Sequence, residues 1–395
     1  MLINRKSGLD RLDEFIKSGL ADYAERRNTD QGPDRHREIV SMLSPYLSRR
    51  LIIESECIQA ALDVFPANSV GKWIDEVIWR IYWRGWLDHN SSVWIDYLST
   101  LDHLQKSGGR DDPRYLNAIN GLSGIECFDA WAEELKTTGY LHNHARMWFA
   151  SIWIYTLRLP WQLGAEFFLG HLLDGDPAVN TLSWRWVAGL HTKGKRYIAT
   201  RDNIERCTQG RFRVSEKLAT QSEADTVEHL CLNPQPEKLR WETPFNTGAV
   251  DLTRDSTLII HGDDLYLEGS ELKGAKVSRI IAIDASHASD QNMISPLVAD
   301  ALNQAMKDGA NRAQLHYDAP LQWAKPAEMS EHLEKNQQLI CMKPNYGYWA
   351  RLLRRECEHL DLKCVQRRTD IALFPHATKG FFTFREKAWS QNFGM

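Results

Sequence analysis

Up to about residue 213, the chain carries apolar residues at steps of three and four positions. The spacing recurs in separate segments, among them GLDRLDEFIKSGL, ECIQAALDVF, VGKWIDEVIWRIYWRGWL, FDAWAEELKTTGYL and HARMWFASIWIYTL. A period of this length places the apolar side chains on one face of an α-helix. We therefore expect residues 1–213 to form an all-helical domain.

The pattern changes downstream of residue 213. Residues 214–255 are polar, contain proline and asparagine and have weak periodicity, which predicts a linker or wrapping segment. Short β-rich runs follow, namely STLIIHG, RIIAIDAS, RAQLHYD, QLICMKP and LKCVQRR, and they alternate with helical stretches around 296–308, 327–336 and 345–360. This alternation predicts a doubly wound parallel sheet, so we expect a Rossmann-like α/β domain over residues 256–395. The domain contains no GxGxxG or Walker loop, and its fold class alone therefore assigns it no cofactor.

Composition agrees with a globular chain of two domains, because 43% of the 395 residues are hydrophobic and 25% are charged. No apolar run approaches the length needed to span a bilayer, and the polar N-terminus does not resemble a secretory signal. We therefore expect a cytoplasmic protein that does not bind membranes. The 7 cysteines show no CxxC spacing, which favours reduced thiols over disulfides, a structural zinc or an iron–sulfur cluster, so no metal is expected.

Charge is distributed unevenly along the chain. The net charge of −4 disfavours a general nucleic-acid binder. From Asn180 to Arg213, however, there are 8 basic residues and 2 acidic ones, so a local basic surface is available. This surface either contacts an anion or is a solvated face that neighbouring acids balance.

Two stretches carry candidate chemistry. Residues 171–189, HLLDGDPAVNTLSWRWVAG, place two aspartates, an asparagine and two tryptophans between Asp174 and Trp186. Such density indicates a cofactor site, although a DGD turn beside an apolar plug would also explain it. On the helix after Gly71, charged and aromatic residues recur at steps of three and four, namely Trp73, Glu76, Trp79, Arg80 and Trp83. This face suits stacking on bases with a carboxylate beside them; the alternative is a buried helix with a satisfied salt bridge.

The run GYLHNHARM (139–147) places Asn143, Arg146 and Met147 on adjacent turns. Asp174 is a natural ionic partner for Arg146, and a buried pair of this kind beside a redox ring would tune the electronic properties of that ring. His142 and His144 are two positions apart and point in different directions on a helix, which argues against a metal pair.

Taken together, these motifs resemble the FAD-binding helical domain of the DNA photolyase/cryptochrome family. The resemblance covers about the first 213 residues. In sequence order it includes Tyr23 and Arg27, SMLSPYLS (41–48), WIDEVIWR (73–80), TGYLHNHARM (138–147), LPWQLGAEFF (159–168), DGDPAVNTLSWRW (174–186) and TQGRF (208–212). The common order of these elements argues against a chance match.

The resemblance implies FAD as the cofactor, folded into a U and active as a photochemical donor in its fully reduced form. It implies that Tyr23, Ser41, Ser44 and Arg80 hold the phosphates and ribityl chain, with Trp73 in the same binding site. The residues that it implies around the isoalloxazine ring are Asn143, Arg146, Asp174, Asp176 and Asn180. The asparagine at position 180, beside flavin N5, favours repair over signalling.

The resemblance also implies a substrate, a cyclobutane pyrimidine dimer flipped out of DNA. Trp79 and Trp186 match the two tryptophans that sandwich the dimer, Glu76 matches the carboxylate that bonds its carbonyls, and Met147 matches a further pocket contact. A dimer weakens base stacking, so flipping it costs less than flipping a normal base. Candidates for phosphate contacts are Arg27, Lys193, Lys195, Arg196 and Arg201.

The function that follows from the resemblance is light-driven dimer repair by electron transfer from excited reduced FAD, the reaction of a deoxyribodipyrimidine photolyase, a carbon–carbon lyase. The first alternative is a cryptochrome-like blue-light photoreceptor without repair activity. A flavoprotein oxidoreductase for small molecules would leave the basic run after Asn180 unexplained. The (6-4) photoproduct is another possible substrate, although enzymes for it favour histidines where this chain has Met147.

Two features depart from the family pattern. Trp184 and Trp161 match the inner two of three tryptophans that relay electrons to the flavin, but the region expected to hold the third, LQKSGGRDDPRYL, has none. Either Tyr115 or another tryptophan ends the relay, or photoreduction is slow. The α/β region follows the flavin domain instead of preceding it. Its last segment, FPHATKGFFTFREKAW (374–389), resembles the segment F-T-P-F-x-K-A-W that closes the family's antenna domain. We expect either a rearranged antenna-like domain, with an unidentified second chromophore if any, or an unrelated α/β module.

Overall fold

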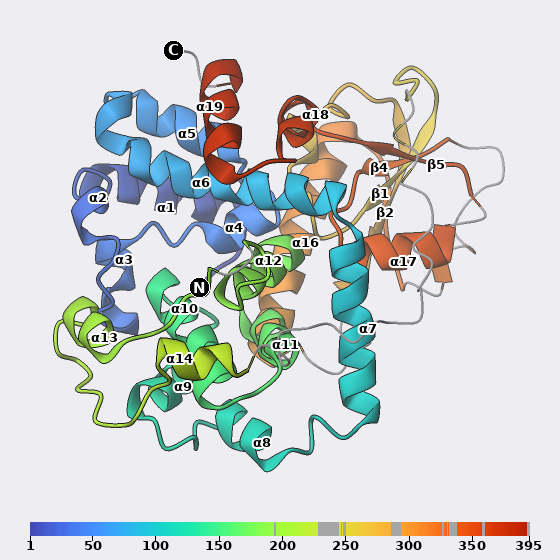
Figure 1. Cartoon of the computed structure of the whole chain (residues 1–395). Helices are drawn as coiled ribbons and strands as arrows, with labels where there is room; N and C mark the ends of the chain where they lie inside the picture. The colour runs from blue at the N-terminus through green and yellow to red at the C-terminus, as the bar shows by residue number, and fades with distance from the viewer. Residues whose placement is uncertain are drawn as a thin grey trace.

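The computed structural model describes residues 1–192, 195–227, 245, 247, 250–285, 294–325, 328–329, 331, 338–357 and 360–392. Figure 1 shows the strands at the upper right and most helices of the N-terminal part to the left of them and below, with α7 beneath the sheet. The helices of the N-terminal part are α1 (Arg5–Ser18), α2 (Tyr23–Arg26), α3 (His36–Ile39), α4 (Ser44–Ser48), α5 (Glu54–Leu62), α6 (Ala67–His89), α7 (Ser92–Lys106), α8 (Pro113–Ile119), α9 (Glu126–Thr138), α10 (Asn143–Ser151), α11 (Trp161–His171), α12 (Pro177–Val187), α13 (Arg201–Cys207) and α14 (Gln221–Asp225). The helical content predicted for the N-terminal part is thus confirmed.

Helix α6 is the element on which the candidate site depends most. It begins after Pro66, and its apolar residues recur at steps of three and four, so that Val70, Ile74, Val77 and Ile81 are all buried. This apolar face anchors the helix in the core. The residues between them, apart from Gly71 and Ile78, are polar or aromatic.

The C-terminal part contains a five-stranded parallel sheet, as predicted. Its strands are β1 (Ser256–Ile260), β2 (Val277–Ile283), β3 (Leu321–Ala324), β4 (Gln338–Met342) and β5 (Leu362–Val365), in the order β3-β2-β1-β4-β5. Strand β1 lies in the centre, where Leu258 is opposite Ile280 on one side and Ile340 on the other. All residues of β1 are buried, which explains why its sequence is a continuous run without alternation. The helices of this part are α16 (Pro296–Tyr317), α17 (Tyr348–Cys357), α18 (Arg368–Leu373) and α19 (Phe381–Asn392).

One predicted strand is wrong. The run RAQLHYD belongs to α16, which extends to Tyr317, and the strand that follows is the short segment Leu321–Ala324. Met306, Ala310 and Ala313 continue the helical spacing of buried residues, and this longer pattern outweighs the β-propensity of the run. The helix predicted over 327–336 lies mostly outside the described residues.

The last segment of the chain packs against the N-terminal helices. In Figure 1, α19 and α18 lie beside α6. Close packing occurs at Gly85 of α6, where an added Cβ would lie 2.9 Å from Ala377 Cβ and 2.9 Å from Phe374 Cδ1. His89 Nε2 also lies 2.8 Å from the carbonyl oxygen of Phe374. Within the described part of the chain, no helix is long and apolar enough to cross a membrane, and no group of three or more potential side-chain ligands could hold a metal ion.

Candidate functional site

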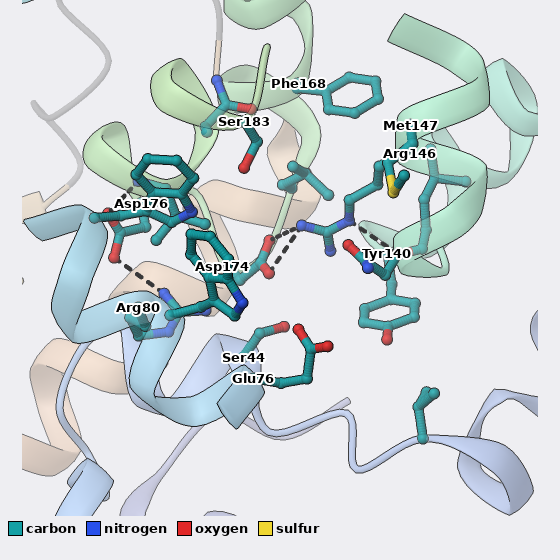
Figure 2. Close-up of a pocket in the computed structure, with 18 of the residues that line it drawn as sticks. Ser44, Glu76, Arg80, Tyr140, Arg146, Met147, Phe168, Asp174, Asp176 and Ser183 are labelled. Carbon is teal, nitrogen blue, oxygen red and sulfur yellow. Dashed lines mark hydrogen bonds and ion pairs between the residues drawn. The ribbon is translucent and has the colours of Figure 1, made fainter. Parts of the chain in front are cut away.

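A cavity of about 460 Å³ lies between α6, α10 and α12. Figure 2 shows side chains from these helices and from the first residue of α4, Ser44, around it. Most of the site residues named from the sequence line this cavity, namely Tyr23, Arg27, Ser41, Ser44, Glu76, Trp79, Arg80, Asn143, Arg146, Met147, Asp174, Asp176, Asn180, Trp184 and Trp186. The structure therefore brings together residues that are spread over more than 160 positions of the sequence.

The loop before α4 turns sharply to bring two serines to the cavity. Met42 has a φ of 52°, in the left-handed region that residues other than glycine seldom adopt. The turn allows both Ser41 and Ser44 to line the cavity, and Ser44 then begins α4. Backbone conformations of this kind cluster at functional sites.

An ion pair between Arg146 and Asp174 spans the cavity wall, as proposed from the sequence. Arg146 Nη1 donates to both carboxylate oxygens of Asp174 at 3.1 and 3.2 Å, and its Nε donates to the carbonyl oxygen of Leu141 at 2.9 Å (Figure 2). Burial alone would raise the pKa of Asp174, but the positive charges of Arg146 and Arg80 outweigh it and hold that pKa below its usual value. Asp174 is therefore a buried carboxylate that keeps its negative charge.

Asp176 has two structural roles at once. Its Oδ1 accepts hydrogen bonds from the backbone N–H groups of Ala178 and Val179, both at 3.1 Å, and so caps the N-terminus of α12. Its Oδ2 accepts from Arg80 Nη1 at 3.0 Å and from Arg84 Nε at 2.9 Å. The carboxylate thus fixes two arginines of α6 to the start of α12, and both of its oxygens are hydrogen bonded within the protein.

Asn180 follows one turn later on α12. Its Nδ2 donates to the carbonyl oxygen of Ala165 in α11 at 2.8 Å. This bond fixes the orientation of the amide, so that the carbonyl oxygen Oδ1 is the atom left to meet a ligand in the cavity.

Glu76 lies inside the cavity but is accessible to solvent. Partial loss of solvent around the carboxyl raises its pKa above the usual value, and the positive charge of Arg27 opposes that effect. Figure 2 shows Glu76 on the same side of the cavity as Ser44. Glu76 is therefore a carboxyl group that gains a proton more readily than an ordinary surface glutamate.

Trp79 and Trp186 form two aromatic parts of the cavity wall. The ring of Trp186 stacks on Tyr197 with centroids 5.6 Å apart. The ring of Trp79 stacks on Phe381, the first residue of α19, with centroids 3.5 Å apart and an interplanar angle of 6°. Both tryptophans are thus supported by a second aromatic ring.

Several predicted residues lie elsewhere. Trp73, expected at the cofactor site, is buried in the core against Phe15, with ring centroids 5.6 Å apart, and does not line the cavity. Trp73 lies on the apolar side of α6, and this explains why it packs in the core and not at the cavity. Trp161 is buried outside the cavity and stacks on Tyr97 at 5.6 Å.

The candidate phosphate contacts are scattered. Arg27 lines the cavity near Glu76, whereas Lys195 and Arg201 are exposed. Arg196 forms an ion pair with Asp225, which engages part of its guanidinium group. Lys193 lies outside the described residues.

The sequence analysis missed three groups at or near the site. Arg84 is 3% exposed and is bonded to Asp176, but its position on α6 carried no motif. Trp153 contacts Trp184, which lines the cavity, with ring centroids 6.2 Å apart. Phe381 lies far downstream in a segment whose resemblance pointed to an antenna domain. No local pattern could have placed these three beside the cavity, because their positions depend on tertiary contacts.

A family model and several curated proteins match part of the chain. Residues 73–217 match the family model described as the FAD binding domain of DNA photolyase. A deoxyribodipyrimidine photo-lyase of Escherichia coli K12 is 28% identical over 204 residues, which make up 49% of this chain and 41% of that protein. The corresponding protein of Agrobacterium fabrum is 31% identical over 185 residues, 46% of this chain and 37% of the relative.

The matches are partial. A bacterial class III photolyase from Agrobacterium tumefaciens, known as a crystal structure, is 26% identical and has a TM-score of 0.44, with 52% of this chain and 43% of that chain covered. The chain spans about two fifths of the length of the curated relatives that it matches. Over residues 73–217, the chain is similar to the FAD-binding domain of DNA photolyases.

Proposed function

We propose that this protein binds FAD and uses light to split cyclobutane pyrimidine dimers in DNA. One observation carries the proposal: Glu76, Trp79 and Trp186 line the same cavity as Asn180 and the Arg146–Asp174 pair. A flavin and a flipped-out dimer would therefore share one enclosure. Short distance between donor and acceptor is what a reaction by electron transfer requires.

The residues present suit FAD. The guanidinium of Arg80 and the hydroxyl groups of Ser41 and Ser44 are donors of the kind that bind phosphate oxygens. The carbonyl oxygen of Asn180 offers an acceptor to a ring N–H, because its Nδ2 already donates to Ala165. The volume lies in the range of small-molecule and cofactor sites. When bound, FAD would supply light absorption and the electron, and the protein would hold and orient it.

The Arg146–Asp174 pair would set the electrostatics of the flavin ring. Asp174 remains ionised although it is 6% exposed, and Arg146 balances its charge from one side of the cavity. A fixed dipole of this kind adjacent to a redox ring changes the relative stability of its charge states. Because both side chains are already bonded to the protein, they need little reorganisation when charge develops.

Substrate recognition would rest on the aromatic walls and on Glu76. Trp79 and Trp186 offer flat apolar surfaces for a dimer whose bases have lost normal stacking. Glu76 can accept from an imide N–H when ionised and donate to a carbonyl when protonated. Its raised pKa favours the second form, which would stabilise negative charge on the dimer carbonyls.

DNA affinity would come from contacts to phosphates without sequence preference. Lys195 and Arg201 are exposed cations on the segment that follows α12. Arg27 would act at the cavity rim, close to Glu76, and its charge would attract the backbone on both sides of a flipped dimer. Arg196 would contribute less, because it is paired with Asp225.

For residues 256–395 we propose a rearranged antenna-like domain, joined to the flavin domain of residues 1–213 by the segment 214–255. The direction of winding in its sheet reverses between β1 and β4, and ligands of doubly wound sheets bind at the carboxyl ends of the strands at such a point. A second cavity, of about 160 Å³, is lined by Asp263, which follows β1, and by Tyr348 and Trp349, which follow β4. A purified protein with an absorption band that FAD does not explain would support an antenna ligand, whereas FAD alone would favour an unrelated α/β module.

The test is repair under blue light. Purified protein with photoreduced FAD is mixed with an oligonucleotide that carries one thymine dimer, and the return of thymine absorbance is followed in the light and in the dark. Glu76→Ala removes the carboxyl group in the cavity, and Glu38→Ala removes an exposed carboxyl group outside it as a matched control. We expect light-dependent repair that Glu76→Ala strongly reduces and Glu38→Ala leaves unchanged.

Flavin photoreduction without any loss of dimer would contradict the proposal. In that case a cryptochrome-like photoreceptor becomes the better account, because the same cavity would hold FAD without acting on DNA. Protein that retains no FAD would contradict both.

A further inference from the structure

The aromatic contact between Trp79 and Phe381 joins the cavity wall to the last helix of the chain. The two rings are nearly parallel, with an interplanar angle of 6° and centroids 3.5 Å apart. Trp79 lines the cavity, whereas Phe381 does not, and Phe381 is only 6% exposed. Phe381 therefore covers one face of the indole from behind, and Trp79 meets the cavity with its other face or its edge.

Helix α6 presents two neighbouring faces to two different parts of the molecule. Glu76, Arg80 and Trp83 line the cavity, at steps of four and three. Asp75 and Tyr82 contact α19 or the residues just before it. Trp79 lies between these two faces and takes part in both.

Helix α19 is fixed to α6 on both sides of Trp79. Asp75 Oδ1 accepts hydrogen bonds from Arg385 Nε and from Trp389 Nε1, the latter at 3.3 Å. Tyr82 Oη donates to the carbonyl oxygen of Lys379 at 2.9 Å. Asp75 is four residues before Trp79 and Tyr82 three residues after it, so the attachments are about one turn away in each direction.

Within α6, the ring of Trp79 contacts Tyr82 edge-on and Trp83 at a tilt, with centroids 5.4 and 5.1 Å apart, so neither ring lies flat against it. Phe381 is stacked parallel to the indole and opposes its rotation away from that plane. An aromatic pair in contact stabilises one relative orientation beyond the effect of buried area. Binding sites need such support, because a side chain held loosely must be ordered when the ligand binds. Phe381 supplies this support, and α19 supplies the position of Phe381.

We propose that Phe381 is a positioning residue that holds Trp79 as a fixed aromatic wall for the flipped dimer, so that the C-terminal helix is a working part of the substrate site. The proposal rests on the proposed function, in which the dimer stacks on Trp79. It adds a role for α19 that is independent of any second ligand in the C-terminal part.

Phe382 provides a matched control. It is the adjacent residue of the same type, it is 77% exposed, and its ring contacts Phe381 rather than Trp79. The test uses the full-length protein loaded with FAD, with the variants Phe381→Ala, Phe381→Tyr, Phe382→Ala and Trp79→Ala. Affinity is measured for an oligonucleotide with one thymine dimer and for the same oligonucleotide without it, and FAD content reports on folding.

We expect Phe381→Ala to weaken binding of the dimer-containing oligonucleotide by about three- to tenfold, the effect of losing one aromatic contact. Binding of undamaged DNA and FAD content should not change, Phe382→Ala should behave as the unmodified protein, and Phe381→Tyr should restore affinity because it keeps the ring. In the Trp79→Ala background, Phe381→Ala should cause no further loss, because it acts through Trp79. Equal effects of Phe381→Ala and Phe382→Ala, or additive losses in the double variant, would overturn the proposal.

A measurement without DNA separates this proposal from the proposed function. In protein labelled with 5-fluorotryptophan, the fluorine resonance of Trp79 is assigned by its disappearance in Trp79→Phe. Loss of the stacked ring in Phe381→Ala should shift and broaden that resonance, and Phe382→Ala should not. If the resonance moves but wild-type protein does not prefer dimer-containing DNA, the repair function fails and the positioning of Trp79 stands. If the resonance does not move, the positioning role is wrong.

Discussion

Replacing Asp176 with asparagine isolates the charge that holds two arginines of α6. Asparagine keeps an oxygen for the backbone N–H groups at the start of α12, so the cap survives. The second oxygen, which accepts from Arg80 at 3.0 Å and from Arg84 at 2.9 Å, becomes an amide nitrogen that cannot accept. Two guanidinium groups in the protein interior then lose their common anion.

The expected cost follows from burial and from the partners that remain. Arg80 is 9% and Arg84 is 3% exposed, and removing one partner of a buried ion pair costs about 3–5 kcal/mol. Arg84 keeps the carboxylate of Glu54 at 3.3 Å and the carbonyl oxygen of Ser48 at 3.0 Å, so we expect the lower end, about 3 kcal/mol. Because the unfolding entropy grows with chain length, each kcal/mol lowers the midpoint of thermal unfolding of a chain of this length by about 1 °C, so the midpoint should fall by about 3–4 °C.

Thermal unfolding followed by far-ultraviolet circular dichroism measures this loss, and FAD content reports on the cavity. The control is Asp13→Asn, which removes an exposed ion pair with Lys17 and should change stability by no more than about 0.5 kcal/mol. FAD content should fall in Asp176→Asn, because Arg80 is no longer oriented toward the cavity. Midpoints that agree between the two variants would refute the argument from buried charge.

The effect of pH has a definite sign. Burial alone would raise the pKa of Asp176, but the charges of Arg84 and Arg80 outweigh it and hold the pKa below the usual value. A carboxyl group with a lowered folded-state pKa stabilises the protein fully above the ordinary carboxyl pKa, and the stabilisation is lost as the pH falls through the lowered value. The difference in midpoint between the unmodified protein and Asp176→Asn should thus persist at neutral pH and shrink only below about pH 4.

Three further changes test other parts of the site. Glu76→Gln keeps the shape of the side chain but cannot titrate. If protonation of Glu76, whose pKa is raised, changes the affinity for dimer-containing DNA at acidic pH, that change should be absent in Glu76→Gln when binding is measured at several pH values. Trp153→Phe should slow photoreduction of bound flavin more than Trp161→Phe, because Trp153 is the ring in contact with Trp184 at 6.2 Å; transient absorption gives the rates. Gly164→Ala would place a Cβ 2.3 Å from Trp184 Cη2, so it should displace that indole and lower FAD content.

Periodicity of apolar residues predicted the kind of structure in each half of the chain. The three- and four-residue steps of α6 correspond to its buried face, and the β1 segment does not alternate because all of its residues are buried in the centre of a parallel sheet. The strand predicted for the run RAQLHYD was wrong because the prediction rested on the β-propensity of seven residues. The buried alanines at 310 and 313 show that the helix continues through this run. The helical period over the whole of α16 therefore outweighs the β-propensity of a few residues within it.

The candidate site was predicted by the resemblance to a family, not by spacing within the sequence. Nothing local indicates that Ser44, Glu76 and Asp174 line one cavity, although the structure shows that they do. The resemblance did not place Trp73 correctly, because the helical period of α6 turns this side chain toward the core. The role of Phe381 could not be predicted from the sequence, because its contact with Trp79 depends on how the C-terminal part packs on the helices.

A network of buried charges explains how the two halves support one cavity. Asp176 at the cavity is bonded to Arg84, which is also bonded to Glu54. The negative charge of Glu54 acts in turn on Arg50. Arg50 is bonded to Asp370 at 2.8 Å and to Asp264 at 3.3 Å, and Arg367 is also bonded to Asp264 at 2.7 Å. Arg50 belongs to the helical part and its two partners to the C-terminal part, and all three side chains are at most 7% exposed. Charges buried to this degree are stable only when paired, so neither part can keep this arrangement without the other. The α/β part therefore holds Arg50 behind Glu54, the carboxylate that is bonded to Arg84 of α6, and α19 supports Trp79. Its place after the helical part in the sequence does not separate it from the cavity.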